Sequence, residues 1–245
     1  MKFFNLKDTE MSAMLDEIEE LAGYKFKDQD LLLTALRHSS YVAEQSEPYE
    51  CNQRLEFLGD AVLQLVLSDF LFTGLPDAQE GILSRTRSML AREQANASYA
   101  LKLKLDKALL LGNGENMSGG RERPSILGDA FEAFLGAVYL DGGLEEARDA
   151  CLRLLPKPQE CLQSLGLKEN PKGMLLEYCQ SRHQQKPEYV CVSAEGPAHK
   201  PIYEVKVIFK GREIARGLGK NRKNAECDAA KNAMLNKEWE ADLLD

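Results

Sequence analysis

The stretch QRLEFLGDAVLQLVLSDFLF, residues 53–72, is the longest strongly apolar segment of this chain, and it carries carboxylates in its interior. Glu56 and Asp60 are four residues apart, so on a helix both side chains project from the same face. Like charges at this spacing repel each other, and partial burial adds a desolvation penalty. The arrangement therefore costs stability unless a cation lies between the two acids.

A second apolar segment repeats this pattern. In ILGDAFEAFLGAVYL, residues 126–140, Asp129 and Glu132 are three residues apart, and the tetrapeptide LGDA occurs in both segments. If the two helices meet face to face, four carboxylates converge on one point. Such an all-oxygen site is of the kind that Mg²⁺ or Mn²⁺ occupies.

A simpler interpretation exists for each acid taken alone. A single acid in an apolar helix is most often a rim residue that points to water, or the partner of a nearby arginine such as Arg54 or Arg123. Two acid pairs at matched spacing, in the two most apolar helices, favour the metal site.

The distribution of charge predicts two domains with different roles. The net charge of −8 argues at first against a nucleic-acid partner. However, residues 1–169 hold 18 Lys and Arg against 28 Asp and Glu, whereas residues 170–237 hold 13 against 7. The last eight residues contain four acids and no base. An acidic front half joined to a basic back half indicates two functional units.

The hydrophobic periodicity assigns a different fold class to each half. The front half is helical nearly throughout and shows no two-residue period before residue 180, which predicts an all-α domain over residues 1–158. The stretch 156–173, which contains three prolines and mixed polar residues, predicts a linker, which we place at 159–169. Residues 170–238 then predict a small α+β domain in the order α-β-β-β-α, followed by an acidic tail at 239–245. The expected helices cover 11–23, 28–40 (with Asp28 as N-cap), 53–72, 80–105, 124–140, 144–155, 170–184 and 221–236, and the expected strands cover 187–197, 201–211 and 212–220.

Composition also bears on location and metal chemistry. No apolar run reaches the roughly 18–20 residues that a transmembrane helix needs, and MKFFNLKDTE at the N-terminus has too few apolar residues for a signal peptide. We therefore expect a cytoplasmic protein with no membrane partner. The six cysteines are scattered without a CxxC pair, which predicts free thiols and argues against zinc.

Specific motifs then point to a family. RLEFLGDAVL (54–63) and ILGDAFEAFLGAVYLDGG (126–143) resemble the two signature stretches of the ribonuclease III family. The back half is similar to a double-stranded RNA-binding domain, through GPAHK (196–200) and GKNRKNAECDAAKNA (219–233). The resemblance covers almost the whole chain, in the domain order of the bacterial enzyme.

The resemblance implies a homodimeric endoribonuclease that depends on Mg²⁺, with Mn²⁺ as a substitute, and needs no organic cofactor. It would hydrolyse phosphodiester bonds in double-stranded RNA to leave 5′-phosphate and 3′-hydroxyl ends, and so process structured precursors such as ribosomal RNA and messages. The main alternative is a double-stranded RNA-binding protein that keeps the fold and does not cleave. A DNA-directed nuclease is a third, weaker candidate.

The resemblance also implies roles for individual acids. The metal ligands would be Glu56, Asp60, Asp129 and Glu132, with Asp60 and Glu132 as the catalytic pair. Glu80 matches a further family acid that supports the site, although an acid at a helix start is also common for electrostatic reasons. Gln53 departs from the family, which usually has an acid there, so a peripheral metal or RNA contact is in doubt.

Two other residues near these motifs have competing interpretations. Phe57 matches a family aromatic that inserts into a pocket of a second subunit, whereas periodicity alone favours a core residue. His38 resembles a family motif, but without a Ser–His–Asp arrangement we interpret it as a structural residue near a helix end.

The predicted RNA-binding residues lie in the back half. Lys220, Arg222 and Lys223 stand at the start of the last helix, where free N–H groups and the dipole already favour phosphate. His199 could reach a minor groove from its turn, and Glu177 matches a groove-contacting family position. Gly173 and Leu176 replace polar family residues, which predicts weaker contacts from that helix.

Overall fold

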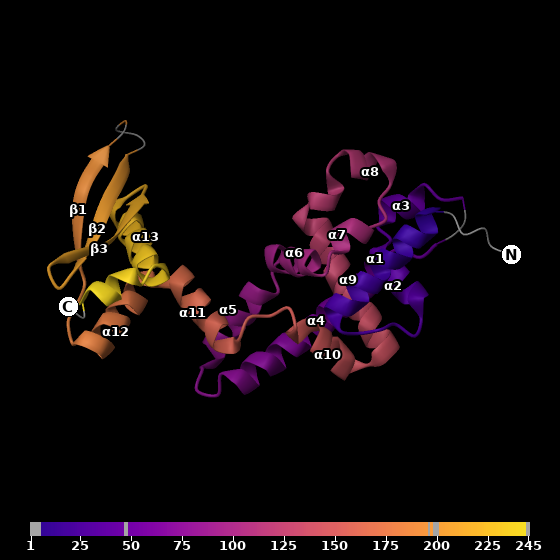
Figure 1. The fold of residues 1–245 in the computed structure, drawn as a ribbon, viewed down its shortest axis with the longest axis horizontal. Helices are drawn as coiled ribbons and strands as arrows, with labels where there is room; N and C mark the ends of the chain where they lie inside the picture. Colours follow the sequence, from indigo (N-terminus) through magenta and orange to yellow (C-terminus); the bar gives the residue numbers. More distant parts are fainter. Residues whose placement is uncertain (1–5, 47–48, 196, 198–200, 244–245) are drawn as a thin grey trace. The chain divides into compact units, whose positions relative to one another are not determined.

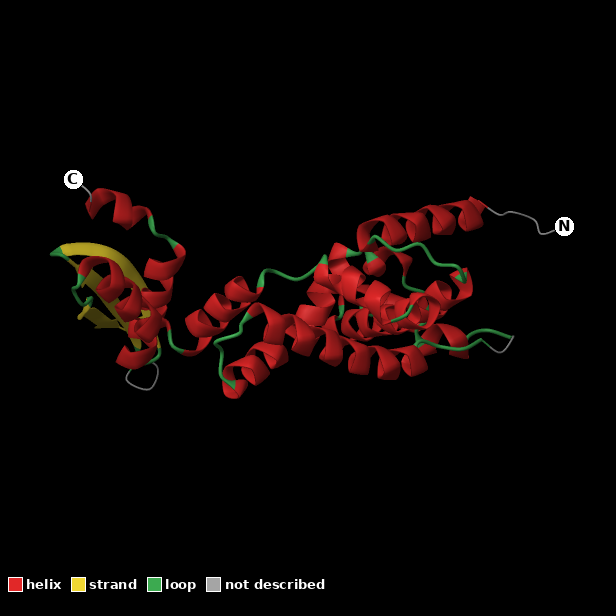
Figure 2. Cartoon of the chain, turned by 90° about the horizontal axis from the view of Figure 1, so that it is seen from below, coloured by secondary structure: helices red, strands yellow, loops and turns green. Residues whose placement is uncertain are grey.

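The computed structural model describes residues 6–46, 49–195, 197 and 201–243, and it divides into two compact units (Figure 1). Unit 1 covers Met1–Cys161 and unit 2 covers Leu162–Asp245. The described part of unit 1 is mostly helical, whereas unit 2 carries a three-stranded sheet, which Figure 2 shows in yellow. The predicted fold classes are therefore confirmed. None of the described helices combines the length and the hydropathy that a bilayer crossing requires.

Unit 1 is built from helices of very different lengths, of which α4 and α9 are the longest in the described residues. The helices are α1 (Leu6–Ala22), α2 (Gln29–Leu36), α3 (Ser39–Ala43), α4 (Gln53–Gly74), α5 (Glu80–Leu90), α6 (Glu93–Lys102), α7 (Leu105–Ala108), α8 (Asn113–Met117), the 3-10 helix η1 (Gly120–Glu122), α9 (Pro124–Gly142) and α10 (Leu144–Leu152). The Asp28 side chain accepts a hydrogen bond from Asp30 N and caps α2, as predicted. The single helix expected over 80–105 is divided into α5, α6 and α7. The backbone is extended at Arg92 and adopts a left-handed conformation at Lys104, which ends the helix at each point.

Two glycines set the closest helix contact of unit 1, which lies between α4 and α9. A Cβ atom at Gly59 would lie 1.7 Å from the Glu132 carbonyl oxygen, and one at Gly136 would lie 2.3 Å from the Leu55 carbonyl oxygen. The two backbones therefore touch directly at this crossing. Around it, α4 buries an apolar stripe that includes Val62, Leu63, Val66 and Leu67, and α9 is buried along nearly all of its length.

Helix α11 (Pro158–Glu169) occupies the segment expected to be a linker, and the division between the units falls within it. Unit 2 continues with α12 (Pro171–His183), β1 (Glu188–Glu195), β2 (Ile202–Phe209), β3 (Arg212–Gly219) and α13 (Arg222–Leu235). The strands form an antiparallel sheet in the order β1-β2-β3. Its core consists of Leu175, Cys179, Val207, Phe209, Ala229, Ala230, Ala233 and Trp239.

The C-terminal segment differs from the expected acidic tail. Residues Glu238–Leu243 form a 3-10 helix, η2, that packs on the core of unit 2. The Trp239 indole is buried and donates to the Ala233 carbonyl oxygen at 2.8 Å. Tyr178 donates to the Glu240 carboxylate at 2.7 Å. A tryptophan anchor and a hydrogen-bonded acid thus hold this segment.

The glycine crossing generates a stability prediction. The substitution Gly59→Ala should lower the free energy of unfolding of the full chain by at least about 2 kcal/mol, because the added methyl group forces two helix backbones apart. Urea unfolding followed by circular dichroism measures the change. Gly114→Ala is the matched control, since a Cβ at this α8 position meets no atom within 4 Å. The control should be neutral or stabilise by up to about 1 kcal/mol, and equal effects of the two variants would contradict the prediction.

Candidate active site

The glycine crossing brings the two predicted acid pairs together. Asp60 follows Gly59 on α4, and the backbone that Gly59 touches on α9 is that of Glu132. Glu56 lies one turn before Asp60, and Asp129 lies about one turn before Glu132. Asp60 is exposed, whereas the other three carboxylates are half-buried. We refer to these four side chains as the acid cluster.

Glu132 has the most perturbed environment of the acid cluster. The pKa of its carboxyl group is raised from the ordinary value of 4.5 to about 7, chiefly by burial and then by the charges of Asp60, Asp129 and Glu56 in that order. A hydrogen bond from Asn96 acts in the opposite direction. The interaction of Glu132 with all three other acids places the four charges in one electrostatic group.

Glu56 and Asp129 are shifted in the same direction for related reasons. Burial raises the pKa of Glu56, and the charges of Asp129 and Asp60 add to the effect. Burial also raises the pKa of Asp129, where His38 opposes the shift and Glu93 adds to it. Each half-buried acid is therefore destabilised in its charged form, which is the state that a bound cation would favour.

The nearby arginines form ion pairs with other acids. Arg54 pairs with Glu50 at 3.3 Å, and Arg123 pairs with Glu115 at 2.7 Å. Among the described side chains, neither arginine is therefore found as the ion-pair partner of an acid of the cluster.

The donor set of the acid cluster fits a hard divalent cation. Its side chains are carboxylates, which suit Mg²⁺ and Mn²⁺ better than softer metals. Within the described residues, no three His, Cys, Asp or Glu side chains are already arranged as a metal-binding group. The acid cluster thus has the ligand chemistry that such an ion requires, and its described side chains are not arranged as a complete set of metal ligands.

Asn96 is a contact of the cluster that the sequence did not reveal. It lies on α6 and is 1% exposed, and its Nδ2 donates to Glu132 Oε1 at 2.7 Å. Glu93, on the same helix, was also missed, although its charge affects Asp129. An asparagine inside a helix without a capping role is a weak signal, because helix propensity alone disfavours it only slightly.

His38 lies at a helix end, as expected. It is the N-cap of α3, and its Nδ1 accepts from Ser40 N at 3.2 Å. Glu80 is exposed at the first position of α5 and accepts from Ser84 Oγ at 2.7 Å. Glu80 is not among the charges that shift the pKa of Glu56, Asp129 or Glu132 in the described chain. Gln53 is exposed at the start of α4.

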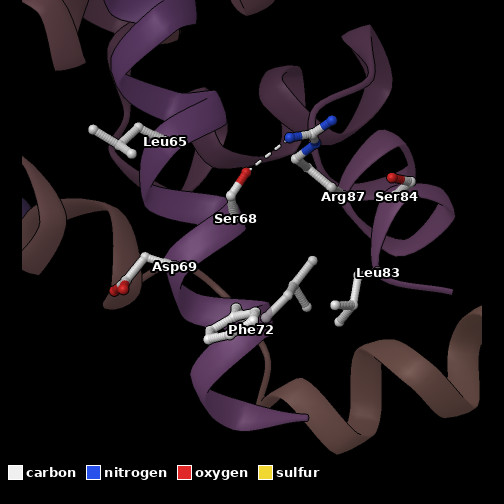
Figure 3. A pocket seen from close by; sticks show the side chains of 8 residues that line it. Leu65, Ser68, Asp69, Phe72, Leu83, Ser84 and Arg87 are labelled. Atoms are coloured by element: carbon white, nitrogen blue, oxygen red, sulfur yellow. Dashed lines mark hydrogen bonds between the residues drawn. The ribbon is translucent and has the colours of Figure 1, made fainter. Parts of the chain in front are cut away.

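Phe57 lies on the surface of the described chain and not in its core. Its side chain is 83% exposed and lines a hollow of about 660 Å³ whose walls include Leu31, Leu55, Leu58 and Leu140. A smaller pocket of about 330 Å³ lies between α4 and α5, where Arg87 donates to Ser68 at 2.8 Å (Figure 3). The acid cluster contributes no side chain to the lining of either hollow.

The predicted cations of unit 2 stand at the start of α13. Lys220 and Lys223 are exposed, and Asn221 caps the helix by accepting from Asn224 N at 2.9 Å. Arg222 donates to Glu226 at 2.9 Å, so its charge is shared with an acid one turn further along. Glu226 also binds Lys172, and the two cations help to hold the pKa of this carboxyl group below its ordinary value.

The other predicted RNA contacts concern α12 and the segment that follows β1. Glu177 is exposed on α12, and Leu176 beside it is half-buried. Gly173 N donates to Asn170 Oδ1 at 3.0 Å, and a Cβ at position 173 would meet the Asn170 amide, which explains the glycine there. His199 lies outside the described residues.

Comparison with known families separates the two units in the same way. Residues 28–158 match the family described as Ribonuclease-III-like, and residues 171–237 match the double-stranded RNA binding motif. The first match contains the acid cluster, and the second contains the start of α13.

Individual relatives extend this similarity over most of the chain. The chain is 42% identical to Ribonuclease 3 of Protochlamydia amoebophila, over 89% of each chain. It is 41% identical to Ribonuclease 3 of Wolinella succinogenes, over 90% of each chain. A solved nuclease domain of ribonuclease III from Campylobacter jejuni, described as having a flexible region involved in dimer formation, matches 57% of this chain and 94% of its own at a TM-score of 0.53 and 42% identity.

The raised pKa of Glu132 predicts a pH-dependent stability. Because the pKa of the folded state is about 7 and the ordinary value is 4.5, the folded protein loses stability as the pH rises through this window. In metal-free buffer at pH 8, Glu132→Gln should raise the free energy of unfolding by about 1–2 kcal/mol, after allowance for solvent screening of a half-exposed group. The gain should disappear towards pH 5.

Denaturant unfolding at pH 5, 6.5 and 8 measures this difference. Glu122→Gln, at an exposed position, is the matched control and should change stability equally little at each pH. A stability gain for Glu132→Gln that is independent of pH would contradict the prediction.

Proposed function

The chain belongs to the ribonuclease III family, and we propose that it hydrolyses double-stranded RNA at the acid cluster while its second, basic unit binds the duplex. The observation that carries this proposal is the α4–α9 crossing, which joins Glu132 electrostatically to Glu56, Asp60 and Asp129. A structural acid would be solvated or paired with a cation, whereas this group keeps four mutually repelling carboxylates in a partly buried place.

The acid cluster supplies the ligands for a divalent ion, Mg²⁺ or in its place Mn²⁺. When bound, such an ion lowers the pKa of a coordinated water and neutralises charge on the scissile phosphate. Asp60, the most exposed of the four acids, and Glu132, which lies deeper, are the proposed catalytic pair. Glu80 is proposed to support the site from the start of α5.

The overall reaction balances as a hydrolysis. The oxygen of a water molecule bonds to phosphorus, and the bond from phosphorus to the 3′-oxygen breaks. The 3′-oxygen leaves with a proton, which gives a 3′-hydroxyl end and a 5′-phosphate end. Structured precursors of ribosomal RNA and messages are the proposed substrates, and a cytoplasmic location stays a prediction.

Unit 2 supplies binding that does not depend on sequence. Lys220 and Lys223 flank the free N–H groups at the start of α13, where phosphate is favoured. Domains of this type recognise the shape of an A-form duplex over about 16 base pairs. Arg222, Glu177 and His199 are proposed as further contacts, and Gly173 and Leu176 limit what α12 contributes.

The decisive experiment incubates the full chain with long duplex RNA, in Mg²⁺ and in EDTA. We expect cleavage in Mg²⁺ alone, and we expect Glu132→Gln to lower the cleavage rate on the order of a hundredfold or more because it removes a charged ligand. Filter binding in EDTA should give the same duplex affinity for both proteins within about twofold, since α13 is unchanged. Glu122→Gln is the control and should cleave at the parental rate.

The alternatives give different results in the same experiment. Binding of duplex RNA in both buffers without cleavage in either would favour a protein that only binds double-stranded RNA. Cleavage of duplex DNA at a comparable rate would favour a DNA-directed nuclease. Full activity of Glu132→Gln would contradict the assigned site.

We further propose that two copies of the chain pair through Phe57. The exposed ring lies beside the hollow lined by Leu31, Leu55 and Leu140, so in a two-fold dimer each Phe57 could fill the hollow of the other copy. An aromatic side chain that fills a pocket is the usual anchor of such an interface. The flexible region described for the Campylobacter jejuni domain supports dimer formation in this family.

Removing this anchor should weaken the dimer. Phe57→Ala should raise the dimer dissociation constant about 30- to 1,000-fold, as expected for loss of an interface hot spot. Sedimentation equilibrium measures the constant. Met117→Ala is the control because Met117 is 88% exposed on α8, away from that hollow, and it should leave the constant unchanged. A monomeric parent, or an unchanged constant in Phe57→Ala, would contradict the pairing.

A further inference from the structure

Asn96 occupies a position on α6 that faces the acid cluster. Helix α6 packs against α9, and a Cβ at Gly128 would lie 3.6 Å from Asn96 Cβ. Glu132 is one turn further along α9, on the same face as Gly128. The small residue at 128 thus lets α6 pass close enough for the Asn96 amide to reach the Glu132 carboxylate, at 2.7 Å.

The orientation of this amide is determined by its neighbours. Nδ2 faces two oxygen acceptors, Glu132 Oε1 at 2.7 Å and the Ala91 carbonyl oxygen at 3.4 Å. The reversed orientation would place oxygen against oxygen. Asn96 Oδ1 is buried and has no hydrogen-bond partner in the described protein.

A purely structural role does not explain this residue well. A buried amide with one unpartnered atom carries a desolvation cost, and asparagine has a slightly lower helix propensity than leucine. Leucine has the same branched skeleton at Cγ and carries no unpaired polar atom, although its methyl groups need more room. The polar side chain is therefore retained despite this desolvation cost, and its one short contact is with Glu132.

We propose that Asn96 is a positioning residue for Glu132, and this inference rests on the proposed metal-dependent cleavage. The amide holds Oε1 through a neutral donor that brings no positive charge, so the charge of the ionised carboxylate and its second oxygen are left to bind the divalent ion. A lysine or arginine in this place would hold the carboxylate equally well but would compete with the metal for its charge.

The test measures metal affinity directly. Binding of Mn²⁺ to the full chain, followed by the electron paramagnetic resonance signal of free Mn²⁺, is compared for the parent and Asn96→Leu. We expect the dissociation constant to rise about ten- to a hundredfold, as is typical when a hydrogen-bond partner of a ligand is removed. In EDTA, loss of the donor to the Glu132 carboxylate lowers the melting temperature modestly, so Mn²⁺ affinity is compared at a temperature where both proteins are folded. The readout that a structural role would not move is the affinity itself. Asn96→Ala serves the same purpose if leucine does not fit.

Two comparisons separate positioning from general disturbance. Thr86→Val removes another fully buried polar group of unit 1, on α5, and should leave Mn²⁺ affinity unchanged. In the Glu132→Gln background, Asn96→Leu should cause little further loss, because its effect acts through Glu132. Additive losses, or parental affinity in both Asn96→Leu and Asn96→Ala, would overturn the positioning role alone. A parent chain that binds no Mn²⁺ would overturn the proposed metal site as well.

Discussion

The direct contact of two helix backbones, at Gly59 on α4 and Gly136 on α9, is the constraint on which the candidate site depends. Ordinary helices pack with their axes 8–10 Å apart, because side chains fill the space between them. Here a Cβ atom at Gly59 would lie 1.7 Å from a backbone oxygen of α9. The residues next to these glycines are consequently brought closer across the interface than side-chain packing would permit. The acids lie near these glycines on the same two helices. The absence of a Cβ atom at Gly59 and Gly136 therefore determines how closely the carboxylates approach one another.

This closeness has an electrostatic cost, which two nearby arginines in the described part of unit 1 do not offset. Arg54 and Arg123 are near enough in sequence to neutralise the acids, but they pair with Glu50 and Glu115 instead. The donor that reaches Glu132 is the neutral amide of Asn96, which fixes the carboxylate without cancelling its charge. In a site selected for stability alone, the arginines would form ion pairs with the acids of the cluster. A site that must attract a divalent ion has to keep its negative charge, and such sites are commonly less stable than the fold could be.

Sequence patterns predicted the parts of the molecule that depend on local rules. The i, i+4 and i, i+3 spacings placed each acid pair on one helix face. In β2 the buried Val205, Val207 and Phe209 alternate with less buried residues, as a half-buried strand predicted over 201–211 requires. Features that arise only from tertiary contacts were not predicted. Asn96 follows no periodic pattern, and Trp239 lies in an acidic run that reads as a tail until the core of unit 2 is seen to accept its indole. Phe57 shows the same limit, because its place in an apolar helix conceals its exposure.

Unit 1 and unit 2 have separate electrostatic roles, and neither unit could fulfil both. A cluster of repelling carboxylates repels RNA phosphates too, so affinity for the duplex has to come from another part of the chain. In the function proposed above, unit 2 supplies this affinity at the start of α13, where Lys220 and Lys223 are exposed while Arg222 shares its charge with Glu226. Because unit 2 is covalently attached, a bound duplex remains at high effective concentration near unit 1. On the same proposal, affinity is supplied without sequence preference, and the position of the cut is left to the acid cluster and to the metal ions that it would hold.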